Sequence, residues 1–269
     1  MTRLYRNLVI PIAALAVMAI GIQTASATTM EDIVSRGELR VAVQTQGPPI
    51  SFIDKNNERT GLAVEIVKEL GKDMGVDVVF KDYDWKGLIP ALIGGKVDFI
   101  AADMTPTAKR ATQLLFTEPA FFTANVAFTT KENMEAKGYS HWKDLNDGAH
   151  TVGATQASTY AAAAKQYLPK ADLKEYSGGT AATAQALSQV RIDAGISDTG
   201  TMKGLMKDYP EFVLLKGEIT KEPLSFATRP DSVHLVRFLD NYIRLIRYNG
   251  KLDEMLDYWW HTTAWEKDH

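Results

Sequence analysis

The sequence contains no cysteine among its 269 residues. This absence excludes a disulfide framework, a thiol nucleophile and a lipid-anchored lipoprotein. The 30 Lys and Arg residues are outnumbered by 33 Asp and Glu residues, the formal charge is −3, and no block of five basic residues occurs. Nucleic-acid binding requires a basic surface that neutralises phosphates, so the composition excludes that class. The hydrophobic fraction of 45% is typical of a globular chain with one or two domains.

Motifs for catalysis and metal binding are also missing. The five histidines show no HExxH pattern or other spacing of metal ligands. Neither a GxSxG turn, nor a GxGxxG loop, nor a phosphate-binding P-loop occurs in the sequence. We therefore predict no bound metal, no cofactor and no catalytic residue.

The long apolar run of the chain lies near its N-terminus. Residues 8–22 are 15 uncharged and mostly apolar residues that follow two arginines and precede the small-x-small sequence Ala25-Ser26-Ala27. A membrane-spanning helix needs about 20 apolar residues. The pattern is therefore typical of a cleavable secretory signal over residues 1–27, with an uncleaved membrane anchor as the alternative. We expect an exported, soluble mature chain that begins at Thr28.

The order of the expected elements is that of an α/β protein. Strands are expected at 39–43, 76–80 and 97–101, with helices at 62–70 and 88–92 between them. A second set follows, with strands at 126–129, 151–154 and 192–196, helices at 158–167 and 183–190, and a final pair of helices at 235–246 and 251–260. Two α/β units in succession predict two lobes. Because no Pro/Gly/Ser linker separates the units, we expect ordered strands that form a hinge.

Hydroxyl groups and a basic side chain follow the third expected strand. Thr105 offers a hydroxyl, Thr107 suits a helix N-cap, and Arg110 offers a planar fork that matches a carboxylate. Free N–H groups at the start of a helix point into the crevice at the carboxyl end of such a strand. These residues predict an anion site. The alternative is a capped surface helix with a solvated arginine.

Three further positions are candidates for ligand contact. Ser158 and Thr159 open the expected alanine-rich helix, where N–H groups and hydroxyls converge again, although a plain N-cap has the same pattern. Asp198 ends the strand at 192–196, where a carboxylate either receives an ammonium group or forms a local turn. Trp85 precedes the helix at 88–92 and either stacks on a ligand or belongs to the core.

The motifs that suggest a family extend over nearly all of the predicted mature chain. They are Gly37 to Val43, Pro48 to Phe52, Gly61 to Ile66, Trp85 with Leu88 to Leu92, Gly95 to Asp98, Thr105 to Arg110, Phe116 to Pro119, Val152-Gly153 and Asn249 to Leu252. Each motif is weak alone, but their order and spacing together are specific. On these motifs the chain resembles the bacterial extracellular solute-binding proteins of family 3, the amino-acid-binding components of ABC importers.

The resemblance implies an α/β fold of the type II periplasmic binding protein kind. Each lobe would be a mostly parallel sheet flanked by helices, and two strands would form the hinge. The first lobe would comprise residues 28–124 and 225–269, and the second residues 125–224. The implied function is a periplasmic monomer that captures an amino acid or derivative between the lobes and delivers it to a permease of the inner membrane.

Motif positions also imply roles for single residues. Arg110 would clamp the ligand α-carboxylate with Thr105 and the N–H of Thr159, next to Ser158, while Asp198 and position 103 would hold the α-ammonium and Trp85 would line the side-chain pocket. The chain departs from the family at three places. Asp103 replaces a small residue and either favours a cationic ligand or pairs with Lys or Arg. Gly47 replaces a stacking aromatic, and Ala157 a frequent glycine.

Two other functions stay open. Families with the same scaffold include periplasmic dehydratases of prephenate or arogenate, and such an enzyme would need a general acid in the cleft. Glu65 and Glu118 are the acids that we would test for that role. A sensor component that presents its ligand to a receptor is the third possibility.

Overall fold

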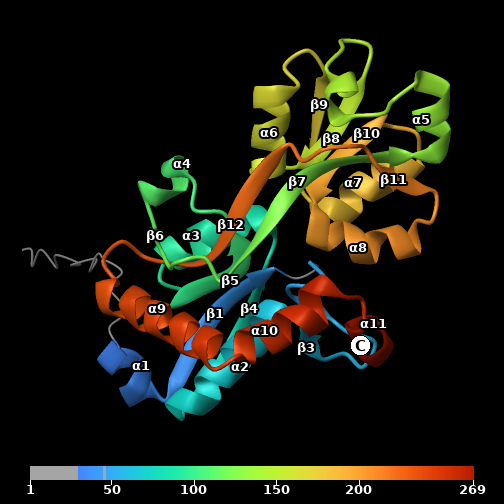
Figure 1. Ribbon diagram of the computed structural model, residues 1–269. Helices are drawn as coiled ribbons and strands as arrows, with labels where there is room; N and C mark the ends of the chain where they lie inside the picture. The colour runs from blue at the N-terminus through green and yellow to red at the C-terminus, as the bar shows by residue number, and fades with distance from the viewer. Residues whose placement is uncertain (1–29, 45–46) are drawn as a thin grey trace, which may run out of the picture.

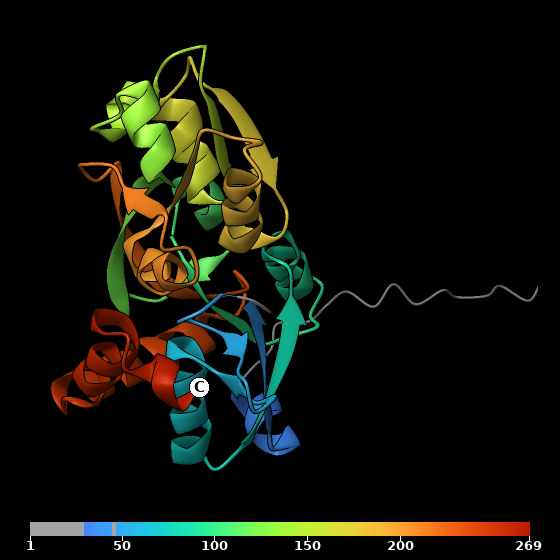
Figure 2. The ribbon, with the colours of Figure 1, turned by 90° about the vertical axis from the view of Figure 1, so that its right-hand side faces the viewer.

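The chain forms two lobes in the computed structural model, which describes residues 30–44 and 47–269. Figure 1 shows one lobe above the other, and the view turned by 90° in Figure 2 shows the same division. The predicted signal peptide, residues 1–27, lies outside the described residues. In the described ranges no helix combines the length and apolar character that a bilayer crossing requires.

The strands form one large sheet and a small hairpin. The strands are β1 (Glu38–Gln44), β2 (Phe52–Ile53), β3 (Arg59–Thr60), β4 (Asp77–Tyr83), β5 (Phe99–Met104), β6 (Leu115–Phe116), β7 (Phe121–Thr130), β8 (Thr151–Thr155), β9 (Asp172–Tyr176), β10 (Ala194–Asp198), β11 (Phe212–Leu214) and β12 (Thr220–Thr228). The large sheet has the order β4-β1-β5-β12-β7-β10-β8-β9, and β2 pairs with β3.

Two long strands carry the large sheet from one lobe to the other. β7 and β12 are antiparallel and pair through the register Thr220↔Asn125 to Leu224↔Phe121. β12 then pairs with β5 of the lower lobe in Figure 1, and β7 with β10 of the upper lobe. Within each lobe the other central pairs are parallel, as β1 with β5 and β8 with β10. The two-strand connection expected from the sequence is thus present.

Helices cover the sheet in both lobes. They are α1 (Met30–Arg36), α2 (Leu62–Met74), α3 (Leu88–Ile93), α4 (Ala108–Ala111), α5 (Lys131–Lys137), α6 (Thr159–Tyr167), α7 (Gly179–Ser188), α8 (Thr199–Asp208), α9 (Val233–Tyr248), α10 (Lys251–Leu256) and α11 (Trp265–Asp268), with single turns η1 (Trp85–Gly87), η2 (Trp142–Leu145) and η3 (Asp257–His261). The chain returns to the lower lobe after β12, so α9 packs beside α2 although about 170 residues separate them (Figure 1).

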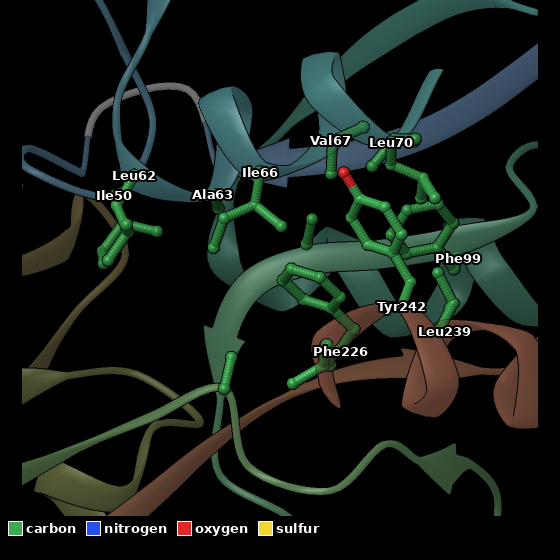
Figure 3. Close-up of a cluster of buried hydrophobic side chains, with 14 of the residues drawn as sticks. Ile50, Leu62, Ala63, Ile66, Val67, Leu70, Phe99, Phe226, Leu239 and Tyr242 are labelled. Atoms are coloured by element: carbon green, nitrogen blue, oxygen red, sulfur yellow. The ribbon is translucent and has the colours of Figure 1, made fainter. Parts of the chain in front are cut away.

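Each lobe has its own hydrophobic core. In the lower lobe, residues of α2 and α9 enclose β5 and β12, as Figure 3 shows for Ile66, Phe99, Phe226 and Tyr242. The upper cores contain residues from 126 to 219 only. Because core membership changes near residues 121–126 and 219–224, we propose that the lobes divide at the predicted boundaries, 28–124 with 225–269 and 125–224.

A glycine in the upper lobe shows how tightly the sheet face is packed. Gly195 on β10 lies opposite Phe128 on β7, and an added Cβ would come within 2.3 Å of the Phe128 ring and 2.9 Å of Thr183. We predict that Gly195→Ala lowers the free energy of unfolding by about 1–3 kcal/mol, because close-packed cores have no room for another methyl group.

Denaturant unfolding followed by circular dichroism measures this change. Gly148→Ala is the matched control, since Gly148 is exposed and its Cβ would approach nothing nearer than 3.7 Å. Equal stability of the two variants would contradict the packing at Gly195.

Candidate functional site

A cavity of about 380 Å³ is lined by residues of both lobes and of the two strands that connect them. The lining residues that the sequence had singled out are Trp85, Asp103, Thr105, Ser158 and Thr159. The remaining two predicted residues, Arg110 and Asp198, do not line the cavity but form hydrogen bonds with the lining residues Thr105 and Tyr160. Residues of both lobes therefore meet where the sequence placed the candidate site.

Arg110 is held at the edge of the cavity by its own loop and by the opposite lobe. Thr107 caps α4 as predicted, accepting a hydrogen bond of 3.2 Å from the Arg110 N–H. The guanidinium donates from Nη1 to the Thr105 carbonyl at 2.9 Å and from Nη2 to the Ala157 carbonyl at 3.2 Å. A guanidinium has five N–H donors. The other three N–H groups of Arg110 have no hydrogen-bond partner in the described part of the chain.

Trp85 reaches the same carbonyl of the opposite lobe. Its indole Nε1 donates to the Ala157 oxygen at 3.2 Å, and the Arg110 Cζ lies 5.3 Å from the centre of its ring. Ala157 has a φ of +61°, a conformation that favours glycine, which explains why a glycine suits this position. One backbone oxygen of the upper lobe therefore fixes two side chains of the lower lobe.

The start of α6 forms the facing wall. Ser158 is the N-cap, the alternative that the sequence had left open: its hydroxyl accepts from the Ala161 N–H at 3.2 Å and donates to the Thr155 carbonyl at 2.6 Å. Thr159, the first residue of the helix, lines the cavity. The positive end of the helix dipole thus lies on the same side as Arg110, which suits an anionic group.

Asp198 takes a structural position close behind the cavity wall. It is the N-cap of α8, and its carboxylate accepts hydrogen bonds from two N–H groups and three hydroxyls, with the side chain 1% exposed. These donors are the N–H groups of Gly200 and Thr201 and the hydroxyls of Thr123, Tyr160 and Thr201. A carboxylate offers about four lone-pair directions. Asp198 therefore orients Tyr160 and Thr123, both of which line the cavity.

Asp103 is the acid that faces the cavity without a partner. Its φ is +48°, and among the described residues no group donates a hydrogen bond or forms a salt bridge to its carboxylate. Burial raises the pKa of Asp103 well above the ordinary value, the charge of Asp198 raises it further, and Arg110 opposes both effects. A ligand ammonium group would supply the missing donors.

Several cavity residues were not found from the sequence. Asn125 and Glu222 come from the connecting strands, Tyr160 from α6, and Trp265 from α11, where its ring centroid is 5.3 Å from that of Phe52. Trp265 and Phe52 provide aromatic surface beside Gly47, which also lines the cavity. Only a sheet register could have identified Asn125 and Glu222, because isolated polar residues are usually solvated.

The two acids considered for the enzymatic alternative lie elsewhere. Glu118 accepts hydrogen bonds from Arg244 at 3.0 Å and Arg247 at 3.2 Å, and Glu65 pairs with Lys68 on α2. Neither lines the cavity. Both acids that were named for a test as a general acid therefore lie outside this cavity and pair with basic side chains.

Contacts between α8 and the last segment of the chain close one side of the cavity. Lys207 forms an ion pair with Glu266, and the Lys203 ammonium donates to the Trp260 carbonyl at 3.0 Å. Gly200 lies against the Trp260 ring, where an added Cβ would come within 2.1 Å. The lobes are therefore in contact on two sides of the cavity.

Comparison with known proteins places this geometry among solute-binding proteins. The family model described as "Bacterial extracellular solute-binding proteins, family 3" matches residues 39–262. The ABC transporter arginine-binding protein 1 of Escherichia coli (strain K12) is 25% identical over 227 residues, which cover 82% of this chain and 90% of the relative.

Solved structures show the same fold over most of the chain. The ancestral amino acid-binding protein AncCDT-1, described as a precursor of cyclohexadienyl dehydratase, has a TM-score of 0.80 and 31% identity and covers 86% of this chain and 98% of its own. A putative ABC transporter binding component from Wolinella succinogenes, complexed with lysine, has a TM-score of 0.79 and 29% identity, covering 86% and 99%. Both likenesses confirm the predicted two-lobe α/β fold.

The unpartnered Asp103 should make the stability of the ligand-free protein depend on pH. Because its folded pKa lies above the unfolded value of about 3.9, the charged carboxylate destabilises the fold at neutral pH. We predict that Asp103→Asn raises the free energy of unfolding at pH 7 by about 1–3 kcal/mol, the usual cost of an unpartnered buried polar group. Asparagine also tolerates the positive φ.

The stability gained by Asp103→Asn should increase as the pH rises. The gain in the free energy of unfolding is near zero only well below about pH 3.9, where Asp103 is protonated in both states, and it grows with pH to its full value above the folded pKa. Denaturant unfolding of the ligand-free protein between pH 4.5 and 8 measures it, with exposed Asp77→Asn as the control. A gain that stays constant over this range would show that the carboxylate is not the cause.

Proposed function

Because the chain belongs to the bacterial extracellular solute-binding proteins of family 3, we propose that it captures an amino acid between its lobes for an ABC importer. The observation that carries the proposal is an arginine fork close to an unpartnered acid at a cavity between two lobes: Asp103 at the end of β5 and Arg110 in α4, which follows it. An α-amino acid has the matching charges, because its carboxylate and its ammonium group are both attached to the α-carbon.

The carboxylate end of the ligand is assigned to the Arg110 side. The three free N–H donors of Arg110, the Thr105 hydroxyl and the N-terminus of α6 at Thr159 supply donors from both lobes. Ser158 stabilises that helix start, and Trp85 covers the outer face of the guanidinium. A carboxylate in this position is therefore bound only when the lobes are together.

The ammonium end is assigned to Asp103, with Asp198 acting mainly through Tyr160 and Thr123. Asp103 has no donor among the described residues, whereas Asp198 already accepts five hydrogen bonds. A ligand ammonium would convert the partly buried, unpartnered Asp103 into one member of an ion pair. Ligand binding and closure of the lobes are then the same thermodynamic event.

The wider setting follows from the family. Its members are extracellular, so we propose that this protein acts in the periplasm after removal of residues 1–27, and that its partner is a permease of the inner membrane. A monomer suffices for this role, because both halves of the proposed site come from one chain. A receptor in place of the permease would use the same ligand site.

A thermal-shift screen of the chain from Thr28 tests the proposal with the standard amino acids, polyamines and opines. A ligand at 100 times its dissociation constant should add about 2.7 kcal/mol to the free energy of unfolding. We predict that Arg110→Ala weakens the binding of any such ligand by about 100-fold or more, because a buried charge loses its partner. Titration calorimetry measures the loss.

Lys109→Ala is the matched control, since Lys109 neighbours Arg110 but is exposed and its side chain has no contact with the cavity. Affinity retained in Arg110→Ala would move the carboxylate site elsewhere. The absence of any shift in the whole screen would remove the basis for an amino-acid-binding protein.

We propose that the chain is a transport protein without catalytic activity. The curated relative that it matches over 90% of that relative's length is an ABC transporter binding protein, and the acids Glu65 and Glu118 lie outside the cavity. The enzymatic alternative is tested by incubation with prephenate, because one structural relative is described as a precursor of cyclohexadienyl dehydratase. Turnover of prephenate would overturn the assignment as a transport protein.

A further inference from the structure

The floor of the cavity is formed by one face of the two connecting strands. Alternate residues of a strand share a face, and Thr123 and Asn125 of β7 lie opposite Glu222 and Thr220 of β12 in the register. Thr123, Asn125, Glu222 and Leu224 all line the cavity. A carboxylate and a carboxamide thus project from the centre of the sheet into the space between the lobes.

These two side chains have unused acceptor capacity. Glu222 is 8% exposed and Asn125 is fully buried. Glu222 Oε1 accepts from Asn125 Nδ2 at 3.1 Å and from the Thr220 hydroxyl at 2.6 Å. Among the described residues nothing donates to Glu222 Oε2, and the buried Asn125 Oδ1 also has no partner. Buried polar groups are normally hydrogen-bonded, so two free acceptors point to a donor that arrives with a ligand.

The charge of the cavity favours a positive donor. Its described lining includes four carboxylates, those of Asp103, Asp208, Glu222 and Glu266, against the single ammonium of Lys207. Lys207 is already paired with Glu266, Arg59 donates to the Gln44 carbonyl and pairs with Asp82, and Arg110 donates to the Thr105 carbonyl. A zwitterion brings no net charge and leaves this negative excess uncompensated.

The position of Glu222 separates it from the proposed amino-acid site. β12 pairs with β5 through Ser225↔Met104, and Glu222 precedes Ser225 by three residues. Three residues of a strand span about 10 Å. Glu222 therefore lies about 10 Å along β12 from the position opposite Met104, the neighbour of Asp103, and its charge also acts on Arg110.

We propose that Glu222 and Asn125 form a subsite for a cationic group at the end of the ligand side chain, so that the protein selects arginine- or lysine-like amino acids. This inference rests on the proposed function and names its substrate class. A guanidinium or ammonium supplies the donors that Glu222 Oε2 and Asn125 Oδ1 lack. Charge-assisted hydrogen bonds of this kind are the stronger ones, and a neutral side chain would leave the acceptors unpaired.

The test compares ligands that differ in side-chain charge and little in shape. Arginine and citrulline, and lysine and glutamine, are titrated by calorimetry into the wild-type protein and into Glu222→Gln. We expect the wild type to prefer arginine over citrulline by about 30-fold or more, the effect of one desolvated charge pair. In Glu222→Gln, which keeps the size of the side chain, the preference should fall to about threefold or less.

Glu218→Gln is the control, because Glu218 is an exposed acid that precedes β12 and should leave the preference unchanged. Wild-type binding of citrulline as tight as that of arginine would overturn the proposal, even if Glu222→Gln failed to fold. An equal preference in wild type and variant would also overturn it, while amino-acid binding itself stood. If no amino acid bound the wild type at all, the proposed function would fail, and this subsite with it.

Discussion

Everything at the cavity depends on the pairing of β7 with β12, because these two strands carry one sheet through both lobes. Their register sets Asn125 opposite Thr220 and Thr123 opposite Glu222, which turns a row of polar residues toward the space between the lobes. The same pairs join the lobes, so the floor of the cavity is also the segment about which the lobes can move. Ligand recognition and closure therefore share one structural element.

The sequence predicted the parts of the site that depend on local rules. Thr107 and Ser158 are N-caps because each precedes a helix and its hydroxyl reaches an N–H three residues later, a pattern readable without a structure. β12 was not predicted, since Glu222-Pro223 interrupts a strand pattern, and its pairing with β5, β6 and β7 comes from the tertiary fold. Glu222 and Asn125 were missed for the same reason.

Asp198 and Asp103 stand at similar positions in the sequence pattern but have different hydrogen-bond partners in the structure. Both lie at the ends of buried strands; Asp198 was expected to hold an ammonium group, and Asp103 either to favour a cationic ligand or to pair with Lys or Arg. The helix that begins after Asp198 gives its carboxylate two N–H donors, whereas Asp103 has a left-handed backbone conformation and Thr107 caps the next helix instead. The carboxylate of Asp103 is therefore left without a donor. The backbone conformation at the end of each strand decides which of the two carboxylates lacks a hydrogen-bond donor. That conformation cannot be predicted from amino-acid composition.

The contacts that hold the lobes together without a ligand explain why closure can be reversible. The ion pair of Lys207 with the largely buried Glu266 keeps one partner, Lys207, in water, and a pair that water still reaches contributes little, about 0–1 kcal/mol. The Ala157 carbonyl accepts from both Trp85 and Arg110, yet Arg110 keeps three donors for a carboxylate. A ligand therefore adds to these bonds and does not have to displace them. Since a ligand shifts an equilibrium only by its differential affinity for the two states, this addition favours the closed state. In the free protein the unpartnered Asp103 opposes closure, and a ligand cation removes that opposition.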